Sequence, residues 1–328
     1  MTKIKELKAN EIGEIGIIRR IAKILDSGYL GDDCAVLEDG GDYLVVTTDM
    51  LHRTTDFPRE MSGEDVGWMS VAVSLSDVAS MGARPIGVVV AMGLPGDTAV
   101  DFIDGLARGM RDCAKTYGTD IVGGDTDQHA ELTLVTTALG RVKKDKLKLR
   151  SGARVGDLLC VTGYLGTPAA AYKALIEGRE APEKDKKVLI ERFFRPKPRV
   201  EEGMRLSNYK EVTAMMDVSD GLGKSVYELS NASKVGFLVD ADRLPLLEAT
   251  RRLAKSREEL LDMAVCFGGE FELLFTLDPS GLDKVKDVDF TVIGRTVEAG
   301  LTLDDRGSMK PITCKGYEHL KKKRDDLH

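Results

Sequence analysis

The sequence predicts a two-domain protein of the α/β or α+β class, and three observations support this prediction. The chain of 328 residues is long enough to form two cores. Short apolar runs rich in β-branched residues alternate with helix-length segments along both halves. A basic run over residues 143–150, followed by Ser151-Gly152-Ala153, has the composition of a domain crossing. We therefore expect an N-terminal domain over residues 1–148 and a C-terminal domain over residues 149–328.

The first half combines helix signals with a hairpin. Apolar residues recur at helical spacing from Ile12 to Ile21, and Ser62-Gly63-Glu64-Asp65 fits a capping box. Glu38-Asp39-Gly40-Gly41-Asp42 has the chemistry of a hairpin turn, so the sheet of this half is not purely parallel. Helices are expected over residues 11–25, 62–81 and 98–117, and strands over residues 34–37, 43–48, 86–94, 120–122 and 132–142.

The second half repeats the alternation. Strands are expected over residues 158–162, 214–218, 236–239, 271–276 and 291–294. Helices are expected over residues 168–176, 221–232, 246–254 and 257–265. The charged stretch 181–187 is expected to be a loop, and residues 193–199, with two prolines, a turn.

Composition and charge narrow the possible partners. The formal net charge is −7 and the basic residues are dispersed, which argues against nucleic acid as the main partner. No apolar run approaches the ~18 residues of a membrane span, and the first ten residues lack an apolar signal core. The five cysteines are never paired at metal-ligand spacing. We expect a cytoplasmic protein with reduced thiols.

The predicted helix over residues 62–81 has little side-chain bulk in its second half. Ala72, Ser74, Ser76, Ala79 and Ser80 are all small, so another backbone element is expected to pack closely against this helix. A carboxylate, Asp77, lies in the middle of this small-residue region.

Several carboxylates share one context, the end of an apolar strand that runs into a Gly, Ser or Thr turn. They are Asp32, Asp33, Asp49, Asp125, Asp217 and Asp220, and Asp77 joins them from its helix. Any one of them is more often a cap than a ligand, but Asp is seldom buried without a partner. Oxygen-rich clusters with flanking hydroxyls suit Mg²⁺, whose chemistry with phosphates is phosphoryl transfer. The four histidines have no neighbours that would form a nucleophilic triad.

The segment from Asp217 to Ser225 resembles a phosphate loop without being one. The Walker pattern requires a glycine five residues before Gly223-Lys224-Ser225, and Val218 stands there. Lys224 is therefore interpreted as an ordinary residue of the following helix. The segment is either a routine strand-to-helix turn or a place where phosphate is held by carboxylates and metal.

Seven motifs in order resemble those of the thiamine-monophosphate kinases, which share a superfamily with aminoimidazole ribonucleotide synthetase, selenophosphate synthetase and HypE. They are Gly31-Asp32-Asp33-Cys34-Ala35, Thr47-Thr48-Asp49-Met50, Ser76-Asp77-Val78-Ala79-Ser80-Met81-Gly82-Ala83, Gly123-Gly124-Asp125-Thr126, Arg150-Ser151-Gly152-Ala153, Asp217-Val218-Ser219-Asp220-Gly221-Leu222 and Gly268-Gly269-Glu270. The resemblance covers essentially the whole chain. It implies ATP-dependent phosphorylation of thiamine monophosphate to thiamine diphosphate by direct in-line transfer. It also implies a homodimer whose N-terminal halves pair their strands into a barrel, with the nucleotide in the cleft between the domains.

The resemblance also implies roles for individual residues. Mg²⁺ ligands would be Asp33, Thr47, Thr48, Asp49, Asp77, Asp125, Asp217 and Asp220, of which Asp49, Asp217 and Asp220 would act in catalysis. ATP contacts would be Gly124, Asp125, Arg150, Ser219 and Tyr117. The acceptor would lie at Asp56, Glu270 and Tyr317.

Two departures from the family pattern fall on the acceptor side. Asp56 stands where the family usually has a histidine, and the Gly268-Gly269-Glu270 motif is one acidic residue short. The added carboxylate would repel a monophosphate unless a cation offsets it. A related ATP-dependent enzyme with a different small acceptor therefore remains an alternative, as does a nucleotide- or metal-binding regulatory protein on the same scaffold.

Overall fold

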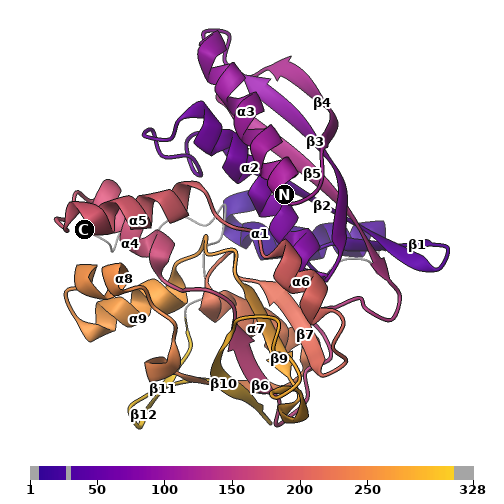
Figure 1. The fold of residues 1–328 in the computed structure, drawn as a ribbon, viewed down its shortest axis with the longest axis vertical. Coiled ribbons are helices and arrows are strands. Elements are labelled where there is room, and N and C mark those ends of the chain that lie inside the picture. The colour runs from indigo at the N-terminus through magenta and orange to yellow at the C-terminus, as the bar shows by residue number, and fades with distance from the viewer. Residues whose placement is uncertain (1–6, 27–30, 314–328) are drawn as a thin grey trace, which may run out of the picture.

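The computed structural model describes residues 7–26 and 31–313, and it contains two open, mixed sheets (Figure 1). Tyr317 and Cys314 lie outside the described residues. The two sheets, one in each half of the chain, confirm the predicted mixed α/β class. Neither sheet closes on itself within the described residues.

The first sheet has the strand order β1-β2-β5-β3-β4. Its strands are β1 (Ala35–Asp39), β2 (Asp42–His52), β3 (Arg84–Leu94), β4 (Ile121–Gln128) and β5 (Thr133–Lys143), and its helices are α1 (Ala9–Leu25), α2 (Gly63–Ser80) and α3 (Val100–Thr116). Only β3 and β4 run parallel; the other neighbours are antiparallel. The chain therefore inserts β5 between β2 and β3, which places residues distant in sequence in the same row.

The second sheet has the order β12-β11-β8-β10-β6-β9-β7. Its strands are β6 (Leu158–Val161), β7 (Val212–Asp217), β8 (Gly236–Asp240), β9 (Leu273–Leu277), β10 (Thr291–Val297), β11 (Leu301–Asp305) and β12 (Ser308–Pro311). The helices of this half are α4 (Thr167–Leu175), α5 (Glu183–Phe194), α6 (Val200–Leu206), α7 (Leu222–Ser233), α8 (Glu248–Leu253) and α9 (Arg257–Cys266). Single-turn 3₁₀ helices lie at η1 (Ala241–Arg243) and η2 (Pro279–Gly281).

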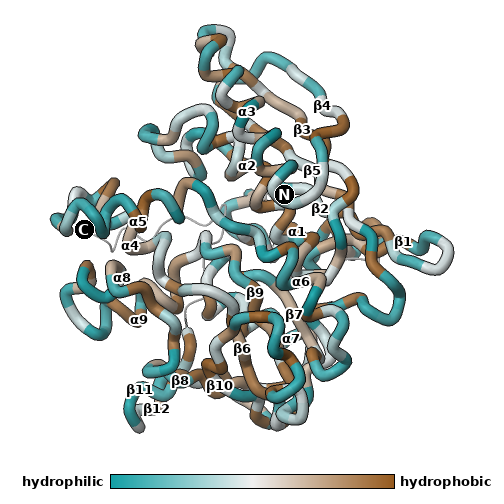
Figure 2. Tube along the Cα trace, viewed as in Figure 1, coloured by the Kyte–Doolittle hydropathy of each residue, from teal (hydrophilic) through white to brown (hydrophobic). Residues whose placement is uncertain are grey.

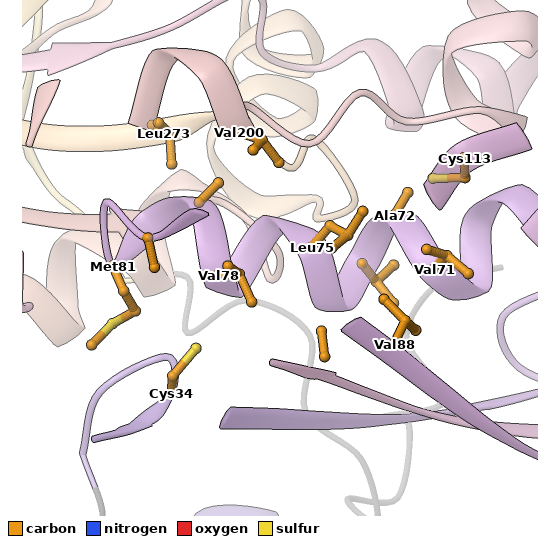
Figure 3. Packing of buried hydrophobic residues seen from close by; sticks show 14 of the residues in the cluster. Cys34, Val71, Ala72, Leu75, Val78, Met81, Val88, Cys113, Val200 and Leu273 are labelled. Atoms are coloured by element: carbon orange, nitrogen blue, oxygen red, sulfur yellow. The ribbon is translucent and has the colours of Figure 1, made fainter. Parts of the chain in front are cut away.

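Helix α2 lies between the two halves of the molecule. Figure 3 shows its apolar residues, among them Leu75 and Val78, between Val200 and Leu273 of the second half and Val88 of the first sheet. The expected close packing against this helix is confirmed, because a Cβ on Gly203 would lie 2.1 Å from the carbonyl oxygen of Ala79. Burial on several sides explains why the helix carries small residues and no narrow apolar stripe.

The N-terminus of α2 also ties the two halves together. The expected capping box is confirmed, since Ser62 and Asp65 exchange side-chain-to-backbone hydrogen bonds. Asp65 also accepts from Arg195 over 2.6 Å, and Trp68 Nε1 donates to the carbonyl oxygen of Pro196 over 2.8 Å. The expected turn at residues 193–199 is shorter, since Phe193 and Phe194 end α5, and residues 195–199 between α5 and α6 form a contact between the halves.

Several expected elements are corrected. The stretch expected to be a loop at residues 181–187 begins α5, because Glu183 and Asp185 occupy its first turn and Leu189 and Phe194 are buried farther along. Hydrophilic residues dominate its first turns (Figure 2), which made it resemble a loop in sequence. The elements α6, β11 and β12 were not predicted from the sequence. No helix in the described part of the chain is both long and apolar enough to cross a bilayer.

Two strands are longer than expected, and each extension places an aspartate inside a strand instead of at its end. β2 continues to His52, so Asp49 lies within the strand instead of ending it. β4 continues through Gly123-Gly124-Asp125, which was expected to be a turn. Gly124 permits this, since a Cβ there would lie 2.0 Å from the carbonyl oxygen of Val90 on the neighbouring strand.

Candidate active site

Three carboxylates from three parts of the chain converge beside α2. Asp33 precedes β1, Asp77 lies in α2 and Asp217 ends β7, and each offers an oxygen within 4.8 Å of the other two. The side chain of Asp33 and the whole of Asp217 are only 1% exposed. We call these three residues the acidic cluster. It joins the two halves of the molecule, as the sequence motifs led us to expect.

Local backbone geometry fixes the C-terminal contribution. The apolar strand β7 pairs with β9 as far as Asp217 opposite Leu273, and Gly221 then turns into α7 with φ +98°. Gly268 approaches this turn so closely that a Cβ would lie 2.3 Å from the carbonyl oxygen of Ser219. The glycines are therefore required for the chain to pass this point with Asp217 pointing toward α2.

Hydroxyl groups are the main hydrogen-bond donors to these carboxylates. Thr47 Oγ1 donates to Asp77 Oδ2 over 2.5 Å, and Ser76 Oγ donates to Asp217 Oδ2 over 2.6 Å. Asp49, on β2, similarly accepts from Ser74 over 2.6 Å. These bonds satisfy one oxygen of each carboxylate without neutralising its charge.

The electrostatics of the cluster are unfavourable for the ionised forms. Burial, and next the charge of Asp33, raise the pKa of Asp217 to about 8. Burial and the charge of Asp49 raise the pKa of Asp77 well above its usual range, and burial also raises the pKa of Asp49. Two ionised carboxylates at this separation repel by roughly 3–4 kcal/mol at an effective dielectric constant of ~20. A bound cation would remove this penalty.

One oxygen of the cluster has no hydrogen-bond partner within the described residues. Asp217 Oδ1 is buried and unpaired, and buried polar atoms of this kind are rare unless they serve a ligand. The donor set consists entirely of carboxylate and hydroxyl oxygens, which fits Mg²⁺ better than zinc or iron. The residues present therefore fit the metal that the sequence motifs imply.

Arg150 is the cation nearest to Asp33. Its guanidinium contacts Asp33 Oδ1 through Nε over 3.1 Å, and it also pairs with Glu228 on α7. The carboxylates of Asp33 and Glu228 raise the pKa of Arg150, although burial opposes them. Asp32 accepts from the Arg150 backbone N–H over 2.6 Å, so it positions this segment.

Lys224 lies in the helix that follows the turn, as expected, but it is buried and paired with a carboxylate. Lys224 is 8% exposed, and its Nζ lies 2.5 Å from Asp220 Oδ2. Asp220, Lys224 and Glu228 follow one another at four-residue spacing: Lys224 and Glu228 share one face of α7, and Asp220 lies in the bend that precedes the helix. That spacing was visible in the sequence and would have indicated a charged face. Asp220 itself lies outside the group of three within 4.8 Å.

Thr48 and Asp125 lie on the other face of the first sheet. Asp49 aligns with Thr136, Val90 and Gly124 across the sheet, whereas Asp125 aligns with Ala91, Val135 and Met50. Residues in neighbouring rows point to opposite faces, so Asp125 points away from α2. It is also three strand spacings, about 14 Å, from Asp49. Thr48 and Asp125 are both exposed, and Thr48 accepts from Thr137.

Tyr117 also lies apart from the acidic cluster. Its ring packs edge-on against Trp68, with the centroids 6.2 Å apart. Trp68 is nine residues before Asp77 on α2, which corresponds to about 13 Å along the helix. Ser219 lies in the bend after β7, where its carbonyl oxygen accepts from Gly269 over 2.6 Å.

The two acceptor-side residues that the structure describes lie in different places. Asp56 accepts from the His52 backbone N–H over 2.7 Å, in the loop after β2. Glu270 is 7% exposed and accepts from Gly166, while its Oε2 has no partner within the described residues. Burial raises the pKa of Glu270 well above its usual range. Glu270 lines a small hollow together with Tyr164, Thr167 and Arg192.

Comparisons with known proteins agree along nearly the whole chain. Models of the AIR synthase related proteins match twice, the N-terminal domain over residues 31–142 and the C-terminal domain over residues 154–305. The chain is 37% identical to a thiamine-monophosphate kinase of Pyrococcus horikoshii over 322 residues, covering 98% of each protein. It is 39% identical to that of Methanospirillum hungatei, covering 92% of this chain and 98% of the relative. The solved structure of AaThiL complexed with AMPPCP and TMP is 30% identical, with a TM-score of 0.88, and covers 96% of this chain and 99% of that one.

Proposed function

The chain belongs to the thiamine-monophosphate kinases of the AIR synthase related proteins, and we propose that the acidic cluster beside α2 is its catalytic centre. The protein is an ATP- and Mg²⁺-dependent phosphotransferase that converts thiamine monophosphate to thiamine diphosphate. The single observation that carries the site is the convergence of Asp33, Asp77 and Asp217 within 4.8 Å, with Asp217 Oδ1 unpaired.

Each residue of the site has a role that follows from its position. Asp33, Asp77 and Asp217 would hold Mg²⁺, with Asp49 and Asp220 beside them and Thr47 orienting Asp77. When bound, Mg²⁺ neutralises the charge of the triphosphate and stabilises charge that develops during transfer. Arg150 is a planar cation suited to bidentate phosphate contact once it leaves Asp33. The acceptor phosphate is already ionised, so direct in-line transfer needs no strong general base.

The acceptor is proposed to lie at Glu270, Asp56 and Tyr317. The unpaired Oε2 of Glu270 offers a partner to the organic part of an acceptor, in keeping with a role for this turn. Tyr317 is proposed on the motif match, and Asp56 on its position, where the family usually has a histidine. The altered residues at Asp56 and after Glu270 favour a second candidate, transfer to a different small acceptor by the same ATP site.

A second copy of the chain accounts for the placement of Asp125. Gly124 and Asp125 lie on the edge strand β4, in which Val122 is 62% exposed, and Met50, in the same row as Asp125 but on β2, is 56% exposed. We propose a homodimer in which first sheets pair into a barrel and one copy brings Asp125 to the partner's nucleotide. Sedimentation velocity tests this: the wild-type chain is expected to be a dimer and Val122→Asp a weaker one. A monomeric wild-type chain with full activity would contradict it.

The domain boundary and the compartment also remain proposals. The long connection between β5 and β6 supports a boundary near residues 148–149. Cys34, Cys113 and Cys160 are buried free thiols, in keeping with the reducing cytoplasm.

Product formation tests the function directly. The purified full-length chain is incubated with ATP, Mg²⁺ and thiamine monophosphate, and thiamine diphosphate and ADP are quantified by chromatography. We expect equal amounts of both products and none when EDTA is present. A panel of other phosphorylated acceptors separates the second candidate, because ADP would then form only with another acceptor. Binding of ATP without turnover of any acceptor would favour a regulatory protein instead.

A further inference from the structure

Three buried serines of α2 each donate a hydrogen bond to a carboxylate from a different part of the chain. Ser74 Oγ donates to Asp49 Oδ2 over 2.6 Å, Ser76 Oγ to Asp217 Oδ2 over 2.6 Å, and Ser80 Oγ to Asp33 Oδ2 over 2.7 Å. All three serines are 0% exposed. Their acceptors come from β2, from the end of β7 and from the segment before β1. One helix therefore sets the orientation of carboxylates from both halves of the molecule.

The spacing of the serines places these bonds on one side of α2. At about 100° per residue, Ser76, Ser80, Asp77 and Ser74 fall within an arc of roughly 160°. Asp77 lies inside this arc, so the helix presents one carboxylate of its own and a hydroxyl to each of its neighbours. Thr47 donates to Asp77 Oδ2 in turn.

Satisfying a buried hydroxyl does not by itself require a carboxylate. A serine in a helix often donates to a carbonyl oxygen one turn earlier. Ser70, equally buried in the same helix, does this with the carbonyl oxygen of Gly67 over 2.9 Å. Ser76 instead forms a short bond to a charged oxygen. Ser80 bonds Asp33 as well as the carbonyl oxygen of Asp77, 2.8 Å away, and Ser74 bonds Asp49 over a shorter distance than the carbonyl oxygen of Thr136, 3.2 Å away. Each of the three hydroxyls thus lies in a short hydrogen bond with a carboxylate, which Ser70 does not.

Each hydroxyl occupies only one of the two oxygens of its carboxylate. Asp217 Oδ2 is taken by Ser76, whereas Oδ1 is unpaired; Asp33 Oδ2 is taken by Ser80, whereas Oδ1 contacts Arg150. Asp217 held in this way presents Oδ1 to a cation, and Asp33 would present its Oδ1 once Arg150 moves away; both are disfavoured as two-oxygen ligands. Mg²⁺ demands octahedral geometry with short single-oxygen contacts, whereas Ca²⁺ accepts six to eight ligands and often takes both oxygens of a carboxylate.

We propose that Ser74, Ser76 and Ser80 are positioning residues that make the site selective for Mg²⁺ over Ca²⁺ by holding one oxygen of each carboxylate. The proposal rests on the proposed function only in that the acidic cluster binds a divalent cation. Partners of metal ligands of this kind typically change metal affinity by about 10–100-fold when they are removed.

The test compares Ser76→Ala with Ser70→Ala in the full-length chain. Ser70→Ala is the matched control, since both serines are fully buried in α2 but Ser70 contacts no carboxylate. Affinities for Mg²⁺ and for Ca²⁺ are measured separately by isothermal titration, with and without AMPPCP. We expect Ser76→Ala to lower the ratio of Mg²⁺ affinity to Ca²⁺ affinity by about tenfold, and Ser70→Ala to leave this ratio at the wild-type value.

The outcomes separate this inference from the proposed function. An unchanged Mg²⁺ to Ca²⁺ affinity ratio in Ser76→Ala would overturn the inference while leaving the kinase activity of the wild-type chain untouched. Should Ser76→Ala not fold, Ser80→Ala and Ser74→Ala are expected to narrow the ratio as well, and unchanged ratios in both would overturn it. A wild-type chain that binds Mg²⁺ yet forms no thiamine diphosphate would contradict the proposed function alone.

Discussion

Two groups of buried carboxylates lie next to each other at the ends of β7 and β9, and they are stabilised in opposite ways. Glu272 is 5% exposed, and both of its oxygens accept from Arg199, over 2.6 and 2.7 Å. Asp217, opposite Leu273 in the adjacent strand, is buried just as deeply but receives a hydroxyl and keeps one oxygen unpaired. Glu272 is paired with a cation of its own, Arg199. In the described part of the chain the acidic cluster is only partly neutralised, by the contact of Arg150 with Asp33.

This difference shows how a scaffold carboxylate can be told from a functional one. A buried carboxylate is costly unless it is paired with a cation and hydrogen-bonded. Arg199 meets this requirement for Glu272 within the chain, so that pair stabilises the turn that carries Glu270. The acidic cluster is only partly neutralised by Arg150, and we infer that Mg²⁺ completes it.

The largest expected effect is the loss of activity when Asp217 is neutralised. Asp217→Asn removes a proposed metal ligand, and thiamine diphosphate formation is expected to fall about 10³-fold, or ~4 kcal/mol of transition-state stabilisation. The same variant removes a charge that Asp217 carries in EDTA above about pH 8, so at such a pH its melting temperature should rise. Glu272→Gln is the matched control: it should lose stability and retain activity within about tenfold. If both variants lost activity equally, the distinction between the two groups would fail.

The next largest effect concerns the scaffold pair. Arg199→Met leaves Glu272 buried without its cation, and the free energy of unfolding in urea is expected to fall by about 3–5 kcal/mol. Replacing both partners, Arg199→Met with Glu272→Leu, should recover most of this loss. A single variant as stable as the wild-type chain would show that Arg199 does not neutralise Glu272.

A smaller effect follows from the pKa of Asp217, which burial and Asp33 raise from 3.8 to about 8. The folded, metal-free chain then holds a proton that the unfolded chain releases above about pH 4. The stability that this group contributes is complete below that pH and is lost as the pH rises toward 8. Between pH 6 and 8 in EDTA, we expect the free energy of unfolding to fall by roughly 2–3 kcal/mol.

Two comparisons check the origin of this pH dependence. Saturating Mg²⁺ should abolish the decline, because the metal binds the ionised carboxylates. Asp217→Asn should show a shallower slope in EDTA than the wild-type chain. Equal slopes would assign the pH dependence to groups outside the acidic cluster.

The smallest effect belongs to Lys224, which neutralises Asp220 at the edge of the site. If this pair serves the site, Lys224→Met should weaken AMPPCP binding in the presence of Mg²⁺ about tenfold and change the melting temperature by less than about 4 °C. A fall in stability without a change in nucleotide affinity would place Lys224–Asp220 with the scaffold pairs, beside Arg199–Glu272.

The sequence anticipated the residues of the acidic cluster but not their surroundings. The motifs grouped Asp33, Asp77 and Asp217 with Asp49, Asp125 and Asp220, and the structure brings the first three within 4.8 Å of one another. The serine and arginine partners depend on how α2, β7 and α7 pack together, which no local pattern shows. Only the spacing of Asp220, Lys224 and Glu228 carried a local signal.

The position of Asp125 shows why the other parts of the site could not be predicted from the sequence. Its motif resembles the other Asp turns, but the strand order puts β5 and β3 between β2 and β4. The face on which Asp125 lies depends on sheet order and register, which are properties of the whole sheet. The helix α5 was missed for a related reason, because its buried residues follow a highly charged first turn.

Isothermal titration of AMPPCP in the presence of Mg²⁺ tests the central claim most directly, with the wild-type chain, Asp217→Asn and Glu272→Gln compared under the same conditions. If Asp217 holds Mg²⁺ that bridges the phosphates, affinity should fall at least about tenfold in Asp217→Asn, and EDTA should weaken binding to the wild-type chain far more than to this variant. Glu272→Gln should bind as the wild-type chain does. Equal affinity of the wild-type chain and Asp217→Asn for the nucleotide with Mg²⁺ would contradict the account.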